Sequence, residues 1–435
     1  MFLAIWIYPK VKSDYNHKAT TNGAKMAKNT QKLSSCSIFL CTSPFLCYTM
    51  RMKIEVTFDE IAPKDRDTYE IIDIRDASDF EHGNIPGSKN MSMQDIYNHR
   101  ELAGKELYIC CRNGTLSLAV ARQLQQDGFL AYNLQGGYVE WLTRHLKMVD
   151  NKQKAQDVEK SLQKKFHDCI FSKFCKAINE YDLLQPNDKV AVCISGGKDS
   201  MLMAKLFQEL KKHNKFPFEV VYLVMDPGYS PENRDIIEKN AKMLNIPVTI
   251  FNTNIFESVY TIPKYPCYVC ARMRRGYLYA KAKELGCNKI ALGHHYDDVI
   301  ETTLMSMLYG GQIETMMPKL HSENFDGLEL IRPLYLIREK DIKHWRDYND
   351  LHFIQCACKF TDTCTAEACQ KNTGSKRKQV KRLIENLAKT DPQIEGCIFR
   401  STQNANLAKL LGFKDKNGVH HSFLDDYVNN NPNKK

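Results

Sequence analysis

Near its centre the sequence reads Lys189-Val-Ala-Val-Cys-Ile-Ser-Gly-Gly-Lys-Asp-Ser200, which joins an apolar run to a predicted helix. The run up to Ile194 is typical of a buried strand, and helical spacing begins near Met201. The two glycines let backbone N–H groups approach a phosphate closely, and a helix N-terminus adds positive potential. A Walker A loop is excluded, because no Ser or Thr follows Lys198 and the four-residue spacer is missing. We therefore expect a solvent-facing phosphate-binding turn of another kind.

Further apolar runs follow at the spacing of an α/β domain. Strands are expected at 218–225, 247–251 and 289–292, with helical segments between them. This alternation predicts a doubly wound parallel sheet. Nucleotides bind such sheets outside the carboxyl ends of the strands, which is where Asp226 and Gly293-His-His-Tyr-Asp-Asp298 fall. The two carboxylates of the second segment could hold Mg²⁺ or orient the reacting groups, and its two histidines could equally satisfy backbone groups.

The turn resembles the PP-loop of ATP pyrophosphatases, which cleave ATP between the α and β phosphates and adenylate a substrate oxygen. That resemblance implies an adenine nucleotide alpha hydrolase-like fold, with ATP and Mg²⁺ as cofactors. The expected nucleotide-binding residues are Ser195, Gly196, Gly197, Lys198, Asp199, Ser200, Asp226, Gly293, His294 and Asp298, and the expected catalytic residues are Lys198, Asp199 and Asp297.

A second turn of catalytic character lies upstream, in Cys111-Arg-Asn-Gly-Thr-Leu-Ser117. It follows a predicted strand at 106–110 and precedes a predicted helix at 116–126. A thiol at a helix N-terminus, surrounded by inward-pointing N–H groups, is favoured as the thiolate. Cys111 is therefore a candidate nucleophile, and Cys110 is expected to be the last buried residue of the strand.

The surrounding sequence resembles the rhodanese family. The resemblance covers about 53–147 and rests on Asp73-Ile-Arg75, on the segment 79–90 and on Leu134-Gln-Gly-Gly-Tyr-Val-Glu-Trp141. It implies that Cys111 carries sulfane sulfur as a persulfide. A phosphatase would need an arginine at the end of the loop, where Leu116 stands. The absent arginine also favours a protein donor, such as a cysteine desulfurase, over thiosulfate. The alternative is an inactive rhodanese fold used for docking.

Six of the cysteines have the spacing of metal ligands. Cys267 and Cys270 form a CxxC before a basic helical start at 272–279, and this motif suits zinc, redox chemistry or an iron–sulfur cluster. Downstream stand Cys356, Cys358, Cys364 and Cys369. These four could instead form a separate zinc site.

From about residue 160 to the tail, the chain resembles the tRNA 2-thiocytidine biosynthesis family, the tRNA-cytidine 2-sulfurtransferases. The matching blocks are Cys267-x-x-Cys270-Ala-Arg-Met-Arg-Arg-Gly-Tyr-Leu-Tyr279, Ala291-Leu-Gly-His-His-Tyr-Asp-Asp298, Ile331-Arg-Pro-Leu, Arg338-Glu-Lys-Asp-Ile342, Asn404-Ala-Asn-Leu and His420-His-Ser-Phe-Leu-Asp-Asp-Tyr427. The resemblance implies a 4Fe–4S cluster held by Cys267, Cys270 and Cys356, with Cys358 as the alternative third ligand. The family pair is usually CxxC, whereas this chain has CxC. Three ligands leave one iron open for sulfide.

The combined resemblances imply an ATP-dependent tRNA sulfurtransferase. It would adenylate C2 of a cytidine, at anticodon-loop position 32, and replace the oxygen with sulfur supplied by the rhodanese-like domain. The alternatives are a uridine thiolase that makes 2-thiouridine or 4-thiouridine, and a non-enzymatic persulfide and iron–sulfur sensor that binds RNA. The expected partners are tRNA and a persulfide donor, and the chain could act as a homodimer.

Charge is spread unevenly along the 435 residues. Residues 1–51 hold seven basic and one acidic residue, 52–150 hold 11 and 16, and 151–435 hold 43 and 34. The basic last part suits a polyanion, and Arg274, Arg275 and the basic helix at 375–389 are expected to contact tRNA phosphates. No apolar run is long enough to span a membrane.

The composition divides the chain into five parts. The expected boundaries are 1–51 for a disordered leader or transit-like extension, 52–148 for the rhodanese-like domain, 149–185 for a linker and helix, 186–345 for the PP-loop domain and 346–435 for a cysteine-rich and basic region. The leader has the composition of an organellar transit peptide, unless translation begins at Met52. We expect a cytoplasmic protein, or a mitochondrial or related organellar one if the transit peptide is genuine.

Overall fold

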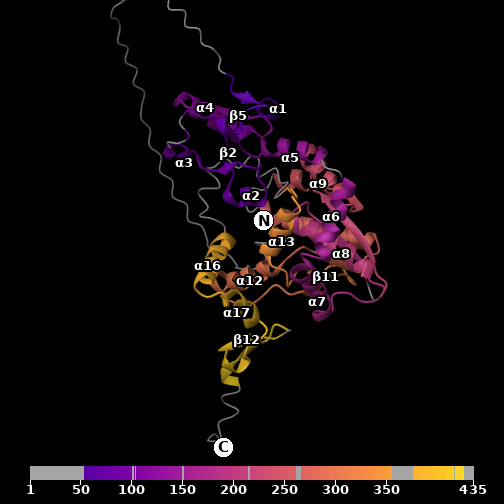
Figure 1. Cartoon of the computed structure of the whole chain (residues 1–435). Helices are drawn as coiled ribbons and strands as arrows, with labels where there is room; N and C mark the ends of the chain where they lie inside the picture. The colour runs from indigo at the N-terminus through magenta and orange to yellow at the C-terminus, as the bar shows by residue number, and fades with distance from the viewer. Residues whose placement is uncertain are drawn as a thin grey trace, which may run out of the picture.

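The structure, a computed structural model, describes residues 53–99, 102, 104–148, 151–213, 216–260, 266–354, 376–415 and 417–425 (Figure 1). The leader at 1–51 and the four downstream cysteines, Cys356, Cys358, Cys364 and Cys369, lie outside these residues. No helix in the described ranges is long and apolar enough to cross a membrane.

The first domain, residues 53–148, is a parallel sheet covered by helices on both faces. Its strands, in spatial order, are β1 (Glu55–Val56), β5 (Ala131–Leu134), β4 (Glu106–Cys110), β2 (Tyr69–Asp73) and β3 (Lys89–Asn90). Its helices are α1 (Phe58–Ile61), α2 (Ala77–His82), α3 (Met93–Asn98), α4 (Thr115–Gln126) and α5 (Gly137–Met148).

Side-chain alternation along β4 divides the core of this domain in two. Leu107 and Ile109 belong to one buried cluster, which also contains residues of α3 and α4. Tyr108 and Cys110 point the other way, into a cluster that includes Leu142 of α5 and continues into the second domain. The first domain is therefore packed onto the second domain through its α5 face.

The second domain, from residue 151, contains the expected doubly wound sheet. Its strands, in spatial order, are β10 (Lys319–His321), β11 (Glu329–Ile331), β9 (Lys289–Ala291), β6 (Lys189–Ile194), β7 (Glu219–Asp226) and β8 (Val248–Asn252). Its principal helices are α8 (Lys198–His213), α9 (Pro231–Met243), α10 (Ile255–Tyr260), α11 (Pro266–Glu284), α12 (Tyr296–Met305) and α13 (Glu339–Tyr348). Only the edge strand β10 is antiparallel among these described strands.

The strand order reverses between β6 and β9, so this pair forms the topological switch point of the sheet. The loops that follow both strands open at the same edge. The fold thus brings the Ser195–Ser200 turn close to the segment from Gly293 to Asp298.

The segment expected to be a linker and helix is helical and packed throughout most of its length. It forms α6 (Asn151–Gln163), a π-helical turn (His167–Phe171) and α7 (Ser172–Glu180). Most of its apolar residues are buried, Val158 and Phe174 fully, while most of its lysines are exposed. The polar composition reflects the exposed face of an amphipathic helix.

The C-terminal part begins with α16 (Lys376–Thr390), close to the expected basic helix at 375–389. It continues with α17 (Ile394–Ser401) and a small hairpin of β12 (Gly412–Lys414) and β13 (His420–Ser422). Helix α16 packs against α12, and through α12 it reaches the switch point (Figure 1).

Candidate functional site

The first candidate site is the loop between β4 and α4. Cys110 ends the strand and is fully buried, and burial raises the pKa of its thiol well above the ordinary value. Cys111 follows, only 4% exposed, and the main-chain N–H of Ser117 donates to its Sγ over 3.3 Å. The Ser117 hydroxyl lies 3.1 Å from the same sulfur. Both groups belong to the first turn of α4, so the loop holds the sulfur at the N-terminus of that helix.

The rhodanese-signature residues form the frame of this loop. Asp73 and Arg75 make a buried ion pair, with Oδ2 and Nη2 2.6 Å apart. The Arg75 guanidinium lies 4.0 Å from the centre of the Tyr138 ring, and the Tyr138 N–H donates to the carbonyl of Cys111 over 2.9 Å. Gly83 is required beside this ring, because a Cβ there would lie 2.3 Å from Oη of Tyr138. The frame therefore fixes the carbonyl of the residue that carries the thiol.

The second candidate site is the turn between β6 and α8. Gly196 has φ +86°, and a Cβ on it would lie 2.7 Å from Cγ1 of Ile237, so the turn requires glycine. Ser200 closes the turn: its Oγ accepts from the N–H of Ser195 over 3.1 Å and donates to the carbonyl of Gly197 over 2.9 Å. The Ser200 hydroxyl is thus engaged by the turn itself.

Lys198 is buried at 5% exposure, so the expectation of a solvent-facing turn is wrong for this residue. Its Nζ lies 3.2 Å from Oδ2 of Asp199 and 3.2 Å from Oε1 of Glu339. Burial opposes the charged ammonium, but these carboxylates outweigh it and raise the pKa of Lys198. The expectation failed because Glu339, at the start of α13, covers the lysine from a distant part of the chain.

Glu339 lies in the block 338–342 that resembles the family, but the sequence alone predicts no role for it. Burial opposes its ionisation, yet the charges of Lys198, His295 and Lys381 lower its pKa well below the ordinary range. Lys381 of α16 contacts Glu339 over 2.7 Å. A charged carboxylate therefore lies between two lysines at the edge of the turn.

The carboxylates after β9 are each engaged by an arginine. Asp297 accepts from the N–H of Glu339 over 2.6 Å, and its Oδ1 lies 3.1 Å from Nη2 of Arg338. Asp298 caps α12 and lies 3.4 Å from Nη1 of Arg377. Arg377 belongs to the basic helix expected to contact tRNA, but it faces the site.

The two histidines between these elements have opposite electrostatic surroundings. Nδ1 of His294 accepts from Nε of Arg332 over 3.1 Å, and burial together with that positive charge lowers the pKa of His294 well below its ordinary value. Burial also opposes protonation of His295, but the carboxylates of Asp298, Asp199 and Asp297 outweigh it and raise its pKa. The surroundings of His294 therefore favour the neutral ring, whereas those of His295 favour the protonated one.

Three buried polar atoms of the site have no hydrogen-bond partner among the described residues: Oδ1 of Asp199, Nδ1 of His295 and Nε of Arg377. Nε of Arg377 still lies 3.0 Å from the carboxylate of Glu301. Buried polar atoms without partners are costly in a finished core and are commonly satisfied by a ligand or ion. In contrast, both carboxylate oxygens of Asp226 have partners. Its Oδ1 accepts from the N–H groups of Gly228 and Tyr229, and its Oδ2 pairs with Arg234.

The CxxC motif lies within α11, not before the helix as expected. The helix begins at Pro266, since proline at a first helical position has the required φ and lacks only a hydrogen that would be unpaired. Cys267 and Cys270 are therefore almost one helical turn apart. Cys270 is 8% exposed, in a cluster with Met225 and Phe256.

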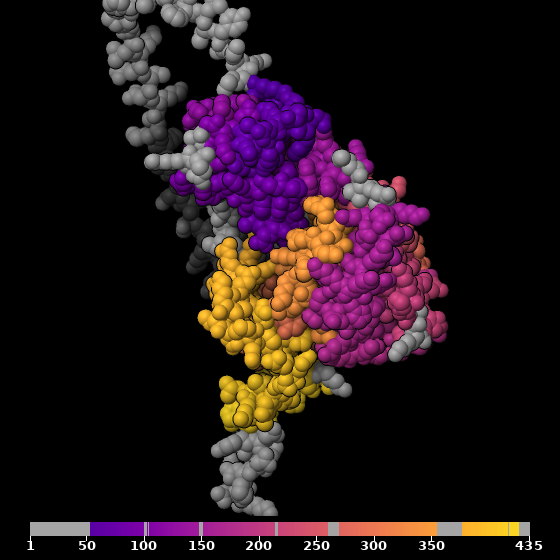
Figure 2. Space-filling model, viewed as in Figure 1, coloured from indigo at the N-terminus to yellow at the C-terminus, as the bar shows by residue number. Residues whose placement is uncertain are grey.

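The two candidate sites are joined by the contact of α2 with α13. Nη1 of Arg346 donates to the carbonyl of His82 over 2.8 Å, and Nζ of Lys343 lies 3.2 Å from Oε2 of Glu81. Burial, together with the positive charge of Lys198, lowers the pKa of His82 to about 4. Figure 2 shows the indigo first domain seated against the orange segment that contains α13. Helix α2 of the first domain therefore lies over the PP-loop turn.

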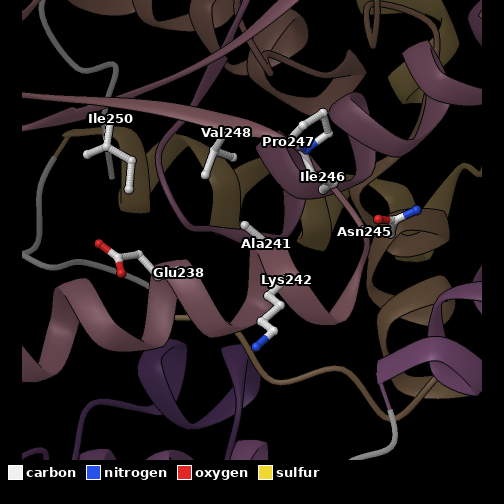
Figure 3. A pocket seen from close by; sticks show the side chains of 8 residues that line it. All are labelled: Glu238, Ala241, Lys242, Asn245, Ile246, Pro247, Val248 and Ile250. Carbon is white, nitrogen blue, oxygen red and sulfur yellow. The ribbon is translucent and has the colours of Figure 1, made fainter.

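A separate surface hollow lies between α9 and β8 (Figure 3). Its lining residues are Glu238, Ala241, Lys242, Asn245, Ile246, Pro247, Val248 and Ile250. None of them is an expected site residue.

Comparison with known families agrees with both domains. Residues 160–360 match the PP-loop domain model, and residues 60–144 match the rhodanese-like domain model. Similar solved structures include a U34-tRNA thiolase of Methanococcus maripaludis with its [4Fe-4S] cluster, at 24% identity and a TM-score of 0.42, covering 53% of this chain and 76% of that one. A rhodanese-related protein of Thermoplasma volcanium is 19% identical, with a TM-score of 0.19, over 21% of this chain and 92% of that one.

Relatives with assigned names are similar to about half of the chain. The tRNA-cytidine(32) 2-sulfurtransferase of Neisseria meningitidis is 37% identical over 186 residues, which is 41% of this chain and 57% of the relative. Those of Aliivibrio fischeri and Coxiella burnetii are each 35% identical over 54% of this chain, and the match covers 75% and 89% of their lengths. The chain thus spans little more than half of the Neisseria relative and most of the other two. On this similarity, the chain belongs to the tRNA-cytidine(32) 2-sulfurtransferase family, and it carries a rhodanese-like domain before the PP-loop domain.

Proposed function

We propose that this protein is an ATP-dependent tRNA sulfurtransferase that replaces the C2 oxygen of cytidine 32 with sulfur held first on Cys111. The observation that carries the proposal is the docking of α2 of the rhodanese-like domain on α13, the helix whose Glu339 pairs with Lys198 of the PP-loop turn. Contact between a sulfur carrier and a nucleotide site suits a reaction that consumes both sulfur and ATP.

The residues of the turn would bind ATP. The backbone of Ser195–Gly197 and the N-terminus of α8 would receive phosphate oxygens, and Lys198 would neutralise negative charge that develops as pyrophosphate leaves. Because Lys198 is already charged and buried between two carboxylates, its position requires little rearrangement on binding.

Mg²⁺ fits Asp199 better than it fits Asp297 or Asp298. Oδ1 of Asp199 is buried without a hydrogen-bond partner, and a carboxylate oxygen is the ligand that Mg²⁺ prefers. Asp297 and Asp298 are each paired with an arginine, so they would orient the site instead.

The thiol donor set fits a 4Fe–4S cluster. Cys267 and Cys270 lie on one helix at CxxC spacing, and Cys356 or Cys358 would be the third ligand. When bound, such a cluster with one open iron supplies a site for sulfide.

The overall reaction balances in two stages. The C2 oxygen attacks the α phosphate of ATP and releases pyrophosphate. Sulfide then attacks C2 and expels AMP. Release of sulfide from the Cys111 persulfide needs two electrons, which a thiol reductant supplies. The expected partners are tRNA, a cysteine desulfurase as the persulfide donor, and a second copy of the chain.

Mass spectrometry of tRNA nucleosides from cells with and without this protein tests the proposal. We expect 2-thiocytidine at position 32 to disappear with the protein. Loss of 2-thiouridine or 4-thiouridine instead would identify a uridine thiolase. Unchanged thionucleosides, together with no AMP formation on purified tRNA, would favour the RNA-binding sensor.

A further inference from the structure

Three side chains from both domains converge at the seam beside α5. His145 belongs to α5 of the first domain, whereas Asp350 and His352 follow α13 of the second. Nε2 of His352 lies 2.9 Å from Oδ1 of Asp350, and Nε2 of His145 lies 3.8 Å from Oδ2. One ligand atom from each residue lies within 4.8 Å of the other two.

Aromatic packing restricts the orientation of both imidazole rings. Trp141 stacks on His145 at 5.1 Å and meets the ring of His352 edge-on at 5.0 Å. The two imidazoles lie 4.8 Å apart at 82°. Their nitrogens therefore converge on one carboxylate before any ion binds.

The backbone that carries the other two ligands is also held firmly. Asp350 has φ +43°, in the left-handed region that aspartate tolerates better than most residues. The preceding Asn349 is buried, and its Nδ2 donates to Oγ of Ser161 over 3.1 Å and to the carbonyl of Trp345 over 2.8 Å. The turn that presents the carboxylate is thus anchored to α6 and α13.

We propose that His145, Asp350 and His352 form an interdomain site for a divalent transition-metal ion, with zinc as the best match and water as its fourth ligand. Imidazole nitrogen and carboxylate oxygen are common zinc ligands, and three protein ligands plus water complete a tetrahedron. Bond lengths near 2.1 Å place tetrahedral ligand atoms about 3.4 Å apart. The two histidines approach different oxygens of Asp350, at 2.9 and 3.8 Å, and the three ligand atoms lie within 4.8 Å of one another, so small side-chain rotations bring them to that spacing.

The carboxylate of Asp350 also suits a bound cation. The carboxylate supplies one negative charge and is partly open to solvent, which leaves room for water. A bound ion would tie α5 to the chain after α13, and so fix α2 over the PP-loop turn.

A hydrogen bond without a metal ion would also account for the His352–Asp350 contact, and the protein contains a second His–Asp pair for comparison. Nδ1 of His167 lies 2.9 Å from Oδ1 of Asp168, the same separation. Among the residues that the structure describes, that pair has no third ligand within the same range, whereas the interdomain group does. His167→Gln is therefore the control for loss of one histidine.

The test measures metal binding by the full chain after its cysteines have been alkylated, so that thiolates cannot bind metal. We expect wild-type protein to bind one equivalent of Co²⁺ with a visible d–d band and no thiolate charge-transfer band, and Zn²⁺ to displace it. His145→Gln and His352→Gln should each weaken Co²⁺ affinity by at least about 100-fold, since even outer-shell changes cost 10–100-fold. His167→Gln should bind as wild type does.

Hydrogen exchange provides a second readout, which does not depend on the Co²⁺ absorbance. Zn²⁺ should slow exchange in α5 and in 349–354 of the alkylated wild type, and it should not do so in His352→Gln. Alkylated wild type that binds no Co²⁺ would overturn the proposal. So would equal weakening in the His167→Gln control, or binding that persists in both interdomain variants.

Discussion

Nη1 of Arg346 donates a 2.8 Å hydrogen bond to the carbonyl of His82, and this bond joins the PP-loop domain to the last turn of α2 in the rhodanese-like domain. Arg346 is only 6% exposed, and its Nε pairs with Asp347. The bond is therefore part of a buried seam and not a surface contact. It holds the domain that carries Cys111 in place over Lys198.

Arg346→Met should uncouple the two sites without disabling either one. Misplacement of a sulfur carrier by a fraction of an ångström to an ångström slows transfer, so we expect tRNA thiolation to fall about tenfold or more. Persulfide loading and tRNA-dependent AMP release should stay near wild type. Arg144→Met, which removes an exposed arginine paired within the first domain, is the control. Equal loss of thiolation and AMP release would show that the arginine acts within the PP-loop domain instead.

Cys111→Ser should abolish persulfide formation in the first domain. The Sγ of Cys111 is the one that accepts from the N–H of Ser117, whereas burial keeps the neighbouring Cys110 protonated. Mass spectrometry of the segment 53–148 after incubation with a desulfurase measures the added sulfur. Cys110→Ala is the matched control and should retain it. Sulfur that remains on Cys111→Ser would assign the carrier to another cysteine.

Lys198→Met should reduce tRNA-dependent AMP release by about 100–1000-fold, the range for removal of one group that stabilises transition-state charge. The variant should also lose stability, since the buried Glu339 would keep Lys381 but lose the cation beside its Oε1. Lys343→Met is the control, because Lys343 approaches the same carboxylate at 3.9 Å from a more exposed position. Its AMP release should be close to wild type. Comparable losses in both would point to general destabilisation of Glu339.

These residues also show what the sequence could predict. The strand Lys189–Ile194 and the turn after it were predicted correctly, because apolar periodicity and adjacent glycines are local signals, but α8 begins at Lys198, three residues before the expected start near Met201. The contact of Lys198 with Glu339 could not be predicted in this way, since it joins positions far apart in the chain. For the same reason the turn was expected to face solvent. Burial by α13 and α2 depends on tertiary packing, which periodicity does not report.

The basic helix α16 illustrates the same limit. Its residues and position were predicted from the sequence, and tRNA binding followed from charge alone. In the structure, Nε of Arg377 lies 3.0 Å from Glu301, and Lys381 contacts Glu339. Two of its cations thus neutralise buried carboxylates. A count of charges cannot separate such residues from those that remain for RNA.

Glu301→Gln should make the protein more stable at alkaline pH than the wild type. Burial raises the pKa of Glu301 from 4.5 to about 7, although the charge of Arg377 opposes the rise. Below pH 4.5 the carboxyl is protonated in both the folded and unfolded states. Between pH 4.5 and about 7 the unfolded chain ionises this carboxyl while the buried one stays protonated, so the folded state loses stability over that window and the loss is complete above it.

The gain from Glu301→Gln should therefore be about 1–3 kcal/mol at pH 8 and close to zero at pH 4.5. Thermal unfolding at both pH values measures it. Arg377 keeps Asp298 as a partner in the variant, which limits the cost of the substitution. Glu284→Gln, at an exposed position of α11, should show no such pH dependence. A gain of the same size at both pH values would contradict the assigned pKa.

The iron content of anaerobically purified protein tests the cysteine assignments. Wild type should contain about four irons per chain and absorb broadly in the visible range. Cys267→Ala and Cys270→Ala should each remove that iron, because two protein thiolates hold a cluster poorly. The two residues lie three positions apart on α11. Cys397→Ala, which removes an exposed thiol, should keep the iron.

The iron content of further variants identifies the third cluster ligand among the downstream cysteines. We expect Cys356→Ala to lose iron and Cys358→Ala to keep it, and Cys364→Ala and Cys369→Ala should also keep it. Iron loss in Cys358→Ala alone would move the third ligand by two residues and leave the sulfide-binding role unchanged. Zinc in place of iron would contradict that role, because a structural zinc site has no open position for sulfide. ATP-dependent adenylation would survive this outcome, since Lys198 and Asp199 lie on α8 and the cysteines do not.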